Sequence, residues 1–321
     1  MTIVLEEPTL ASSTANTNVA GHRLQLATTA IRLRFRWPGV RKSLSPDQKR
    51  LAAGAFEADH SVLSAAKKLL DTSHPAFRAV SAVKSETVAF WREHSLPYVE
   101  PGVRLVRRQD VDLMENHLRR AQVELGQAVE QLDLFYGQLI TQARVHLGDL
   151  FDASDYSVSL SDEFELSWDY PATEPPDYLQ SVAPEVYEAE CRRVRERFAE
   201  AVQIAESTFA EELSQLVSHL ANRLSGDDDG KPKIFRDTAI TNLKEFFDRF
   251  ERLNINSDEQ LEQLVARARG LLGGVRPDEL REQESLRQRI ASGLVRVEAS
   301  LDGYLAERPR RNILRRTATN E

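Results

Sequence analysis

The residues best suited to chemistry in this chain are seven histidines, one cysteine and several clustered acids. The histidines stand at positions 22, 60, 74, 94, 117, 146 and 219. No two of them have the four-residue spacing that places both imidazoles on one helix face, and a single cysteine cannot complete a thiolate site. Cys191 lies within a helical pattern, so we interpret it as a small apolar filler. The sequence therefore predicts no metal site and no cofactor.

Two groups of acids resemble known sites only in part. The run Asp227–Gly230, followed by Lys231, has neither the spacing of a calcium loop nor that of a phosphate loop, and we interpret it as a solvated connector. Asp152 and Asp155 could pair as catalytic carboxylates, but they lie in a long acidic run without a nearby base. The chain also lacks a nucleophile elbow, a dinucleotide-binding turn and a kinase signature. We therefore expect a protein that is not an enzyme.

Charge is distributed very unevenly along the chain. The 42 basic and 50 acidic residues give a net charge of −8, which disfavours a protein that binds nucleic acid over its whole surface. Residues 22–50 nevertheless hold eight Arg and Lys against one acid, and residues 308–316 hold five Arg and no acid. Residues 151–190 hold eleven acids and no Lys or Arg. Such blocks predict contacts with partners of opposite charge or with one another.

These blocks define two candidate docking surfaces. The basic candidates are Arg32, Arg34, Arg36, Trp37, Arg41, Lys42, Arg308, Arg310, Arg311, Arg315 and Arg316. The acidic candidates are Asp162, Glu163, Glu165 and Asp169. One hypothesis pairs the Arg face of strand 31–37 with the acidic face of strand 163–170, within one chain or between subunits. A second has the Arg ladder contact phosphate, and a third takes it as the solvent face of an edge strand.

Alternating residues predict the strands that carry these charges. Ile31, Leu33, Phe35 and Trp37 alternate with three arginines, which is the period of a strand with one buried face. A second short strand is predicted for residues 103–106. The two alternating runs within 156–170 predict a small β-hairpin.

Long helices dominate the remainder. Apolar or small residues recur at 111, 114, 118, 121, 125, 128, 132, 135 and 139, which is a heptad pattern of the kind found in coiled coils. A helix is also predicted for about 46–71, another for 75–94, and a second long one for about 184–224. Because neither long seam can stay exposed, we expect the helices 109–150 and 184–224 to form an antiparallel hairpin in an elongated molecule.

The predicted fold is mainly α with small β elements at 31–37, 103–106 and 156–170, and with a C-terminal helical bundle. The predicted division comprises a disordered tail at 1–21, a basic strand with two helices at 22–108, the long hairpin at 109–224 with its acidic β tip at 151–183, a helical region at 225–307 and a basic and polar tail at 308–321.

Three stretches resemble a known family. Trp37–Leu44 resembles a Trp-x-Gly-x-Lys-x-Leu element, Gly102–Val106 resembles a Gly-Val-Arg segment, and 234–255 resembles a C-terminal helical block. The family is an uncharacterised phage and bacterial domain of unknown function. Its members are often encoded beside MoxR-type AAA+ ATPases and von Willebrand factor A proteins. The resemblance implies a helical protein, with an AAA+ ATPase complex as an expected partner, and implies no activity.

Taken together, these patterns predict an accessory, adaptor or structural protein that assembles through protein–protein contacts, with itself or with an ATPase complex. The alternative is a nucleic-acid-binding protein that uses the basic strand and the Arg-rich tail. A cytoplasmic location is expected, because the chain has one cysteine, no signal-peptide pattern and no stretch of about 18 uninterrupted apolar residues. No membrane partner is expected.

Overall fold

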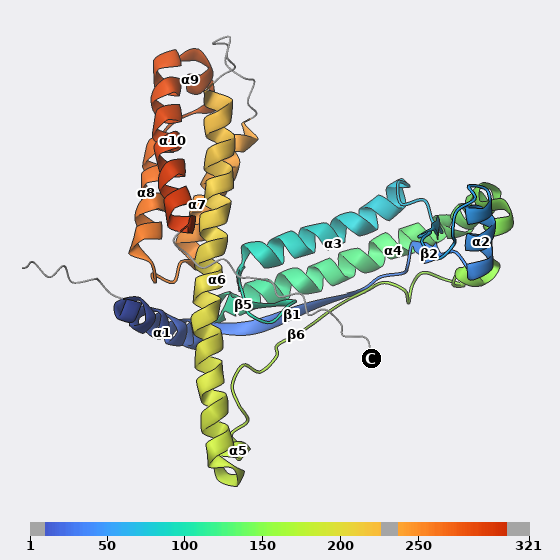
Figure 1. Cartoon of the computed structure of the whole chain (residues 1–321), viewed down its shortest axis with the longest axis horizontal. Coiled ribbons are helices and arrows are strands. Elements are labelled where there is room, and N and C mark those ends of the chain that lie inside the picture. Colours follow the sequence, from blue (N-terminus) through green and yellow to red (C-terminus); the bar gives the residue numbers. More distant parts are fainter. Residues whose placement is uncertain (1–9, 226–236, 307–321) are drawn as a thin grey trace, which may run out of the picture. The chain divides into compact units, whose positions relative to one another are not determined.

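The computed structural model describes residues 10–225 and 237–306, and these residues form two compact units (Figure 1). Unit 1 comprises the described parts of 1–28, 96–101 and 174–321. Unit 2 comprises 29–95 and 102–173. The fold is mainly helical with small β elements, which confirms the predicted fold class. The division differs from the predicted one, because 29–95 and 109–173 belong to a single unit.

Unit 2 is built on two helices that lie side by side, α3 (Pro75–Glu93) and α4 (Val111–Leu147) (Figure 1). The face of α4 that is buried consists of Met114, Leu118, Ala121, Leu125, Val129, Leu132, Tyr136, Leu139 and Ala143. The heptad pattern is therefore right over its first half. Beyond it, Val129 and Tyr136 are buried where the pattern predicts Ala128 and Phe135, because the buried face follows the 3.6-residue period of a straight helix.

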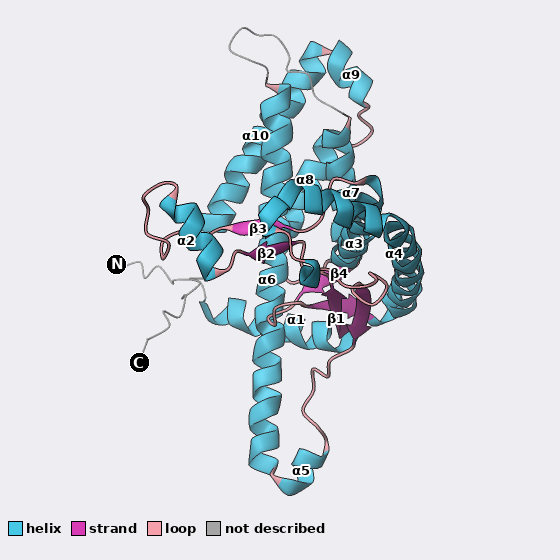
Figure 2. Ribbon diagram, turned by 90° about the vertical axis from the view of Figure 1, so that its right-hand side faces the viewer, coloured by secondary structure: helices cyan, strands magenta, loops and turns pink. Residues whose placement is uncertain are grey.

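The strands of the described residues form two sheets (Figure 2). The larger sheet has the order β4-β5-β1-β6 and the smaller one pairs β2 with β3. Their bounds are β1 Thr28–Arg36, β2 Arg41–Ser43, β3 Ala66–Lys68, β4 Ser95–Pro97, β5 Val103–Arg107 and β6 Glu165–Asp169. The strands predicted at 31–37 and 103–106 are confirmed.

The β-hairpin predicted within 156–170 is wrong in its pairing. Residues 165–169 form β6, but residues 156–160 form no strand, and β6 pairs antiparallel with β1 instead. Side-chain contacts hold the first run in a loop: the Leu160 N–H donates to Asp133 Oδ1 of α4 at 2.8 Å, and the Tyr156 hydroxyl donates to the Leu69 carbonyl at 3.0 Å.

The helix that forms within the predicted range 46–71 is much shorter than predicted. Helix α2 (Pro46–Gly54) begins with a capping box between Ser45 and Gln48. Beyond Gly54, Glu57 adopts a left-handed backbone conformation with φ 51°, which ends the helix. The last part of the range forms β3, because its backbone pairs with β2. Short 3-10 turns lie at Arg108–Asp110, Gly148–Leu150 and Ala153–Asp155.

Unit 1 is organised around the long helix α6. Helices α10 and α1 make its most extensive contacts, and α5, α7 and α8 also pack on it. The bounds are α1 Leu10–Ala27, α5 Tyr178–Val182, α6 Pro184–Leu224, α7 Thr238–Leu253, α8 Glu259–Leu272, α9 Pro277–Glu282 and α10 Glu284–Ala306. Phe209, Phe246 and Phe250 meet edge-on or stacked in its core.

The predicted hairpin of the helices 109–150 and 184–224 is wrong in its partners. Both helices form, but α4 packs along α3 in unit 2, whereas α6 packs along α10 and α1 in unit 1. An apolar seam shows that a helix face must be covered, and it does not determine which element covers it. Here α3 covers the seam of α4, and α10 together with α1 covers that of α6.

The loose tail predicted at 1–21 is wrong for residues 10–21, which belong to α1. Ala20 and Leu24 are buried, and a Cβ at Gly21 would lie only 2.9 Å from the Ala199 backbone nitrogen of α6. Small residues thus let the two helices cross closely, and tertiary packing orders a segment whose composition is typical of a tail. Residues 1–9 lie outside the described residues.

We predict that Gly21→Ala destabilises unit 1 by about 1 to 3 kcal/mol, because the added methyl group overpacks the crossing of α1 and α6. Gly303→Ala is the matched control, since a Cβ at Gly303 of α10 meets nothing within 4 Å. Chemical denaturation measures both. Equal stability of the two variants would contradict the close crossing.

Candidate functional site

The outer face of the β1–β6 pair brings the basic and acidic candidates together. In this antiparallel register Arg32 lies opposite Asp169 and Arg36 lies opposite Glu165. Arg34 Nη2 is 3.2 Å from Asp169 Oδ1, and Arg36 Nη2 is 3.0 Å from Glu165 Oε2. The Arg face and the acidic face thus meet within one chain, as the first hypothesis has it.

These ion pairs change the charge of the surface more than its stability. The Arg34 and Arg36 side chains keep more than half of their surface exposed, and exposed pairs contribute only about 0.2 to 1 kcal/mol each. Their larger effect is electrostatic, since two carboxylates stand beside the three arginines of the ladder. A phosphate group that approached Arg34 or Arg36 would have to compete with a carboxylate already in place.

The remaining predicted candidates have different surroundings. Trp37 packs edge-on against Phe164 with ring centroids 4.6 Å apart, and Lys84 Nζ lies 4.7 Å from the Trp37 ring. Its ring is therefore used in packing. Glu163 accepts a hydrogen bond from the Ser157 hydroxyl.

Two further candidates are exposed. Arg41 lies on β2, and Asp162 lies in the loop before β6. The five arginines predicted between 308 and 316 lie outside the described residues.

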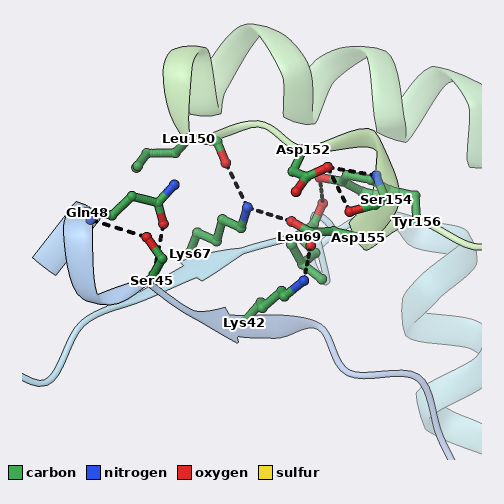
Figure 3. Close-up of polar contacts among 10 residues, drawn as sticks. All are labelled: Lys42, Ser45, Gln48, Lys67, Leu69, Leu150, Asp152, Ser154, Asp155 and Tyr156. Atoms are coloured by element: carbon green, nitrogen blue, oxygen red, sulfur yellow. Dashed lines mark hydrogen bonds and ion pairs between the residues drawn. The ribbon is translucent and has the colours of Figure 1, made fainter.

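A polar cluster that sequence reasoning missed joins the small sheet to the loop after α4 (Figure 3). Lys42 and Lys67 lie opposite each other on β2 and β3, and both ammonium groups contact the Asp155 carboxylate. Lys67 Nζ lies 2.5 Å from Asp155 Oδ2 and donates to the Leu150 carbonyl at 2.7 Å. The side chain of Lys67 is 5% exposed and that of Asp155 is inaccessible, so this pair is buried.

The cluster holds its carboxylates in fixed structural roles. Hydrogen bonds from Lys42 and Lys67 lower the pKa of Asp155 below its usual value. The Ser154 hydroxyl and backbone N–H do the same for the pKa of Asp152, whose side chain caps the short turn at Ala153–Asp155. Both acids weighed as a catalytic pair are therefore ionised and engaged by donors of the protein itself.

The sequence signal for this cluster was the pair Lys67–Lys68 next to Leu69–Leu70, at the end of the range predicted as helix. Two apolar residues directly after two lysines fit a strand end at least as well as a helix face. The partner, Asp155, lies far away in sequence, so pattern alone could not link them.

A second polar contact ties β6 to the start of α4. Glu115 Oε1 accepts hydrogen bonds from Trp168 Nε1 at 2.6 Å and from the Tyr170 hydroxyl at 2.7 Å. Arg119 Nε lies 3.2 Å from the other Glu115 oxygen. Burial and the neighbouring Glu115 carboxylate raise the pKa of Tyr170. This contact fixes where the end of β6 lies along the helix.

Histidine and cysteine side chains take part in packing. The Phe90 ring stacks between the rings of His94 and His117, with centroids 3.9 and 3.6 Å away. Cys191 is a free, half-buried thiol on α6. In the described ranges, 10–225 and 237–306, no three His, Cys, Asp or Glu side chains are grouped to hold a metal ion. None of the helices among those residues combines the length and apolarity needed to cross a lipid bilayer.

Comparison with known proteins yields no relative: no family model, no curated protein and no solved structure matches this chain.

We predict that Asp155→Asn destabilises unit 2 by about 1 to 3 kcal/mol at neutral pH, because it leaves the buried Lys67 ammonium without its counter-ion. Asp149→Asn, at an exposed position in the same segment, is the control. Urea unfolding monitored by tryptophan fluorescence measures both.

The same variant carries a pH signature. Because the pKa of Asp155 is lowered in the folded state, its contribution is complete above about pH 4 and is lost as the pH falls towards the folded-state pKa. The difference in stability between wild type and Asp155→Asn should shrink over that range. A constant difference down to acid pH would contradict the ion pair.

Proposed function

We propose that this chain is a non-enzymatic assembly protein that acts through contacts with other proteins, including further copies of itself. The observation that carries the proposal is that large apolar side chains are exposed in two short segments. One is α2 and the loop after it, where Leu51, Phe56 and Val62 are 79%, 82% and 81% exposed. The other is α5 with the start of α6, where Tyr178, Val182 and Val186 are exposed. Contiguous exposed apolar patches are typical of protein interaction surfaces, and the proposal takes the side chains of each segment to form such a patch.

Charge supports the same proposal. The second segment is rich in acids, with Glu174, Asp177, Glu185, Glu188 and Glu190 and no Lys or Arg over 174–190. An apolar centre with charge around it favours a protein partner of opposite charge and sets its orientation. The ladder on β1 offers less to a polyanion, because Arg34 and Arg36 already pair with carboxylates.

The partner itself is part of the proposal. Self-association through the two exposed segments can be tested directly, because it needs only the purified chain. The AAA+ ATPase complex implied by the resemblance of 37–44, 102–106 and 234–255 stays a prediction.

We predict that the purified chain forms species of more than 36.3 kDa at micromolar concentration. Phe56→Glu combined with Val62→Glu should shift the mass towards that of one chain with little change in Tm, since neither side chain is packed. Leu134→Glu is the control, because Leu134 is also 76% exposed but lies on α4 outside both segments. Sedimentation equilibrium gives the masses.

A single-chain mass at every concentration would contradict self-assembly. The nucleic-acid alternative has its own measurement, which is retention on DNA or RNA at about 50 mM salt. Retention that is lost when Arg32, Arg34 and Arg36 become Ala would favour that alternative over the proposed function.

A further inference from the structure

Strand β6 is an edge of the larger sheet. One side of β6 pairs with β1, and no other strand of the described residues lies on its second side. The Leu166 carbonyl accepts a hydrogen bond from Gln122 Nε2 of α4 at 3.1 Å, so this carbonyl points away from β1. Because strand groups alternate in direction, the N–H and C=O of Trp168 point the same way. The Gln122 amide thus binds one backbone carbonyl of this edge, and further backbone N–H and C=O groups of β6 point in the same direction.

A groove runs between this edge and α4. It encloses about 220 Å³ and is lined on the helix side by Leu125, Gly126 and Val129, and on the strand side by Phe164 and Leu166. A Cβ at Gly126 would meet nothing within 4 Å, so the groove is open at that point. A helix that faces an edge strand across an apolar groove is the arrangement in which an extended peptide adds as a further strand.

The rim of the groove is acidic. Glu130 and Glu165 line it and are both exposed, and Glu165 also pairs with Arg36 of β1. Asp162 follows directly on Ser161, another lining residue. Within the groove lining there is no Lys or Arg. A peptide that fits this groove therefore has an apolar residue for its floor and basic residues on either side of it.

The chain itself contains such a segment. Residues 308–316 read Arg-Pro-Arg-Arg-Asn-Ile-Leu-Arg-Arg, and only Glu307 separates them from the end of the described residues at Ala306. In a strand, Arg311, Ile313 and Arg315 would share one face, which places a single apolar residue between two basic ones. Pro309 has no N–H to donate and precedes this stretch, where a strand tolerates it.

We propose that residues 310–316 of one copy add as a strand to the β6 edge of a second copy, with Ile313 over Leu125 and Val129 and with Arg315 beside Glu130. This inference rests on the proposed self-assembly and adds a contact to the two exposed apolar segments at α2 and α5 named above. Helix α10, which precedes the segment, belongs to unit 1, and the groove belongs to unit 2, so each copy carries both halves of a head-to-tail contact. Such contacts generate rings when they close and filaments when they do not.

The experiment uses a fluorescent synthetic peptide of residues 307–317 and the full chain, diluted below the concentration at which it self-associates. Fluorescence anisotropy should show saturable binding that weakens as salt is raised. Gly126→Leu fills the groove and Glu130→Lys reverses its charge, and each should weaken binding by about tenfold or more. Gly137→Leu is the matched control, because Gly137 is exposed on α4 and equally uncrowded but lies outside the groove. A peptide with Ile313→Asp should bind more weakly than the native peptide.

Several results would overturn the inference. The first is absence of binding, and the second is equal binding to wild type and Gly126→Leu, which would place the peptide elsewhere, such as on the acidic segment 174–190. If the full chain self-associates and Gly126→Leu leaves its mass unchanged, this contact is wrong while the proposed function stands. If the peptide binds the groove but the chain keeps a single-chain mass at every concentration, self-assembly is wrong and the segment is bound within its own copy.

Discussion

The antiparallel pairing of β1 with β6 is the interaction on which the rest of unit 2 depends. It joins the first and last strands of that unit and so closes the loop of chain between them. Its inner face presents Ile31, Leu33 and Leu166 to the core beneath α3 and α4. Its outer face sets Arg34 and Arg36 beside carboxylates. One pairing therefore determines where the core lies, how the charged ladder is neutralised and which strand is left at the edge.

Apolar burial and polar contacts stabilise that arrangement in different ways. The buried face of α4 supplies area that is removed from water, which stabilises without fixing a register. Directional contacts supply the register: Trp168 and Tyr170 donate to Glu115 near the start of α4, and Lys67 contacts Asp155 in the loop beyond its end. Removing an apolar contact should lower the stability alone, whereas removing a directional contact should lower the stability and also let the strand or loop slip.

Sequence patterns predicted elements better than they predicted partners. Strict alternation over 31–37 located β1 and its charged face, and the opposite charge of 163–170 indicated a match that the structure contains. The apolar seams predicted α4 and α6 equally well, but they did not indicate that α3 and α10 would cover these helices.

Composition misled at residues 10–21, where Gly21 serves a close helix crossing. The Lys67–Asp155 pair and the β6 groove were not visible at all, because each joins residues that only the tertiary fold brings together.

The central claim is that the β6 edge is an assembly surface, and amide hydrogen exchange of its backbone tests this most directly. The full chain is labelled at a concentration where it is assembled and again after dilution to single chains. The account predicts that the amides of Leu166 and Trp168 exchange more slowly in the assembled sample, while β5 in the sheet interior is unchanged. Equal exchange of the β6 amides in the two samples would contradict it.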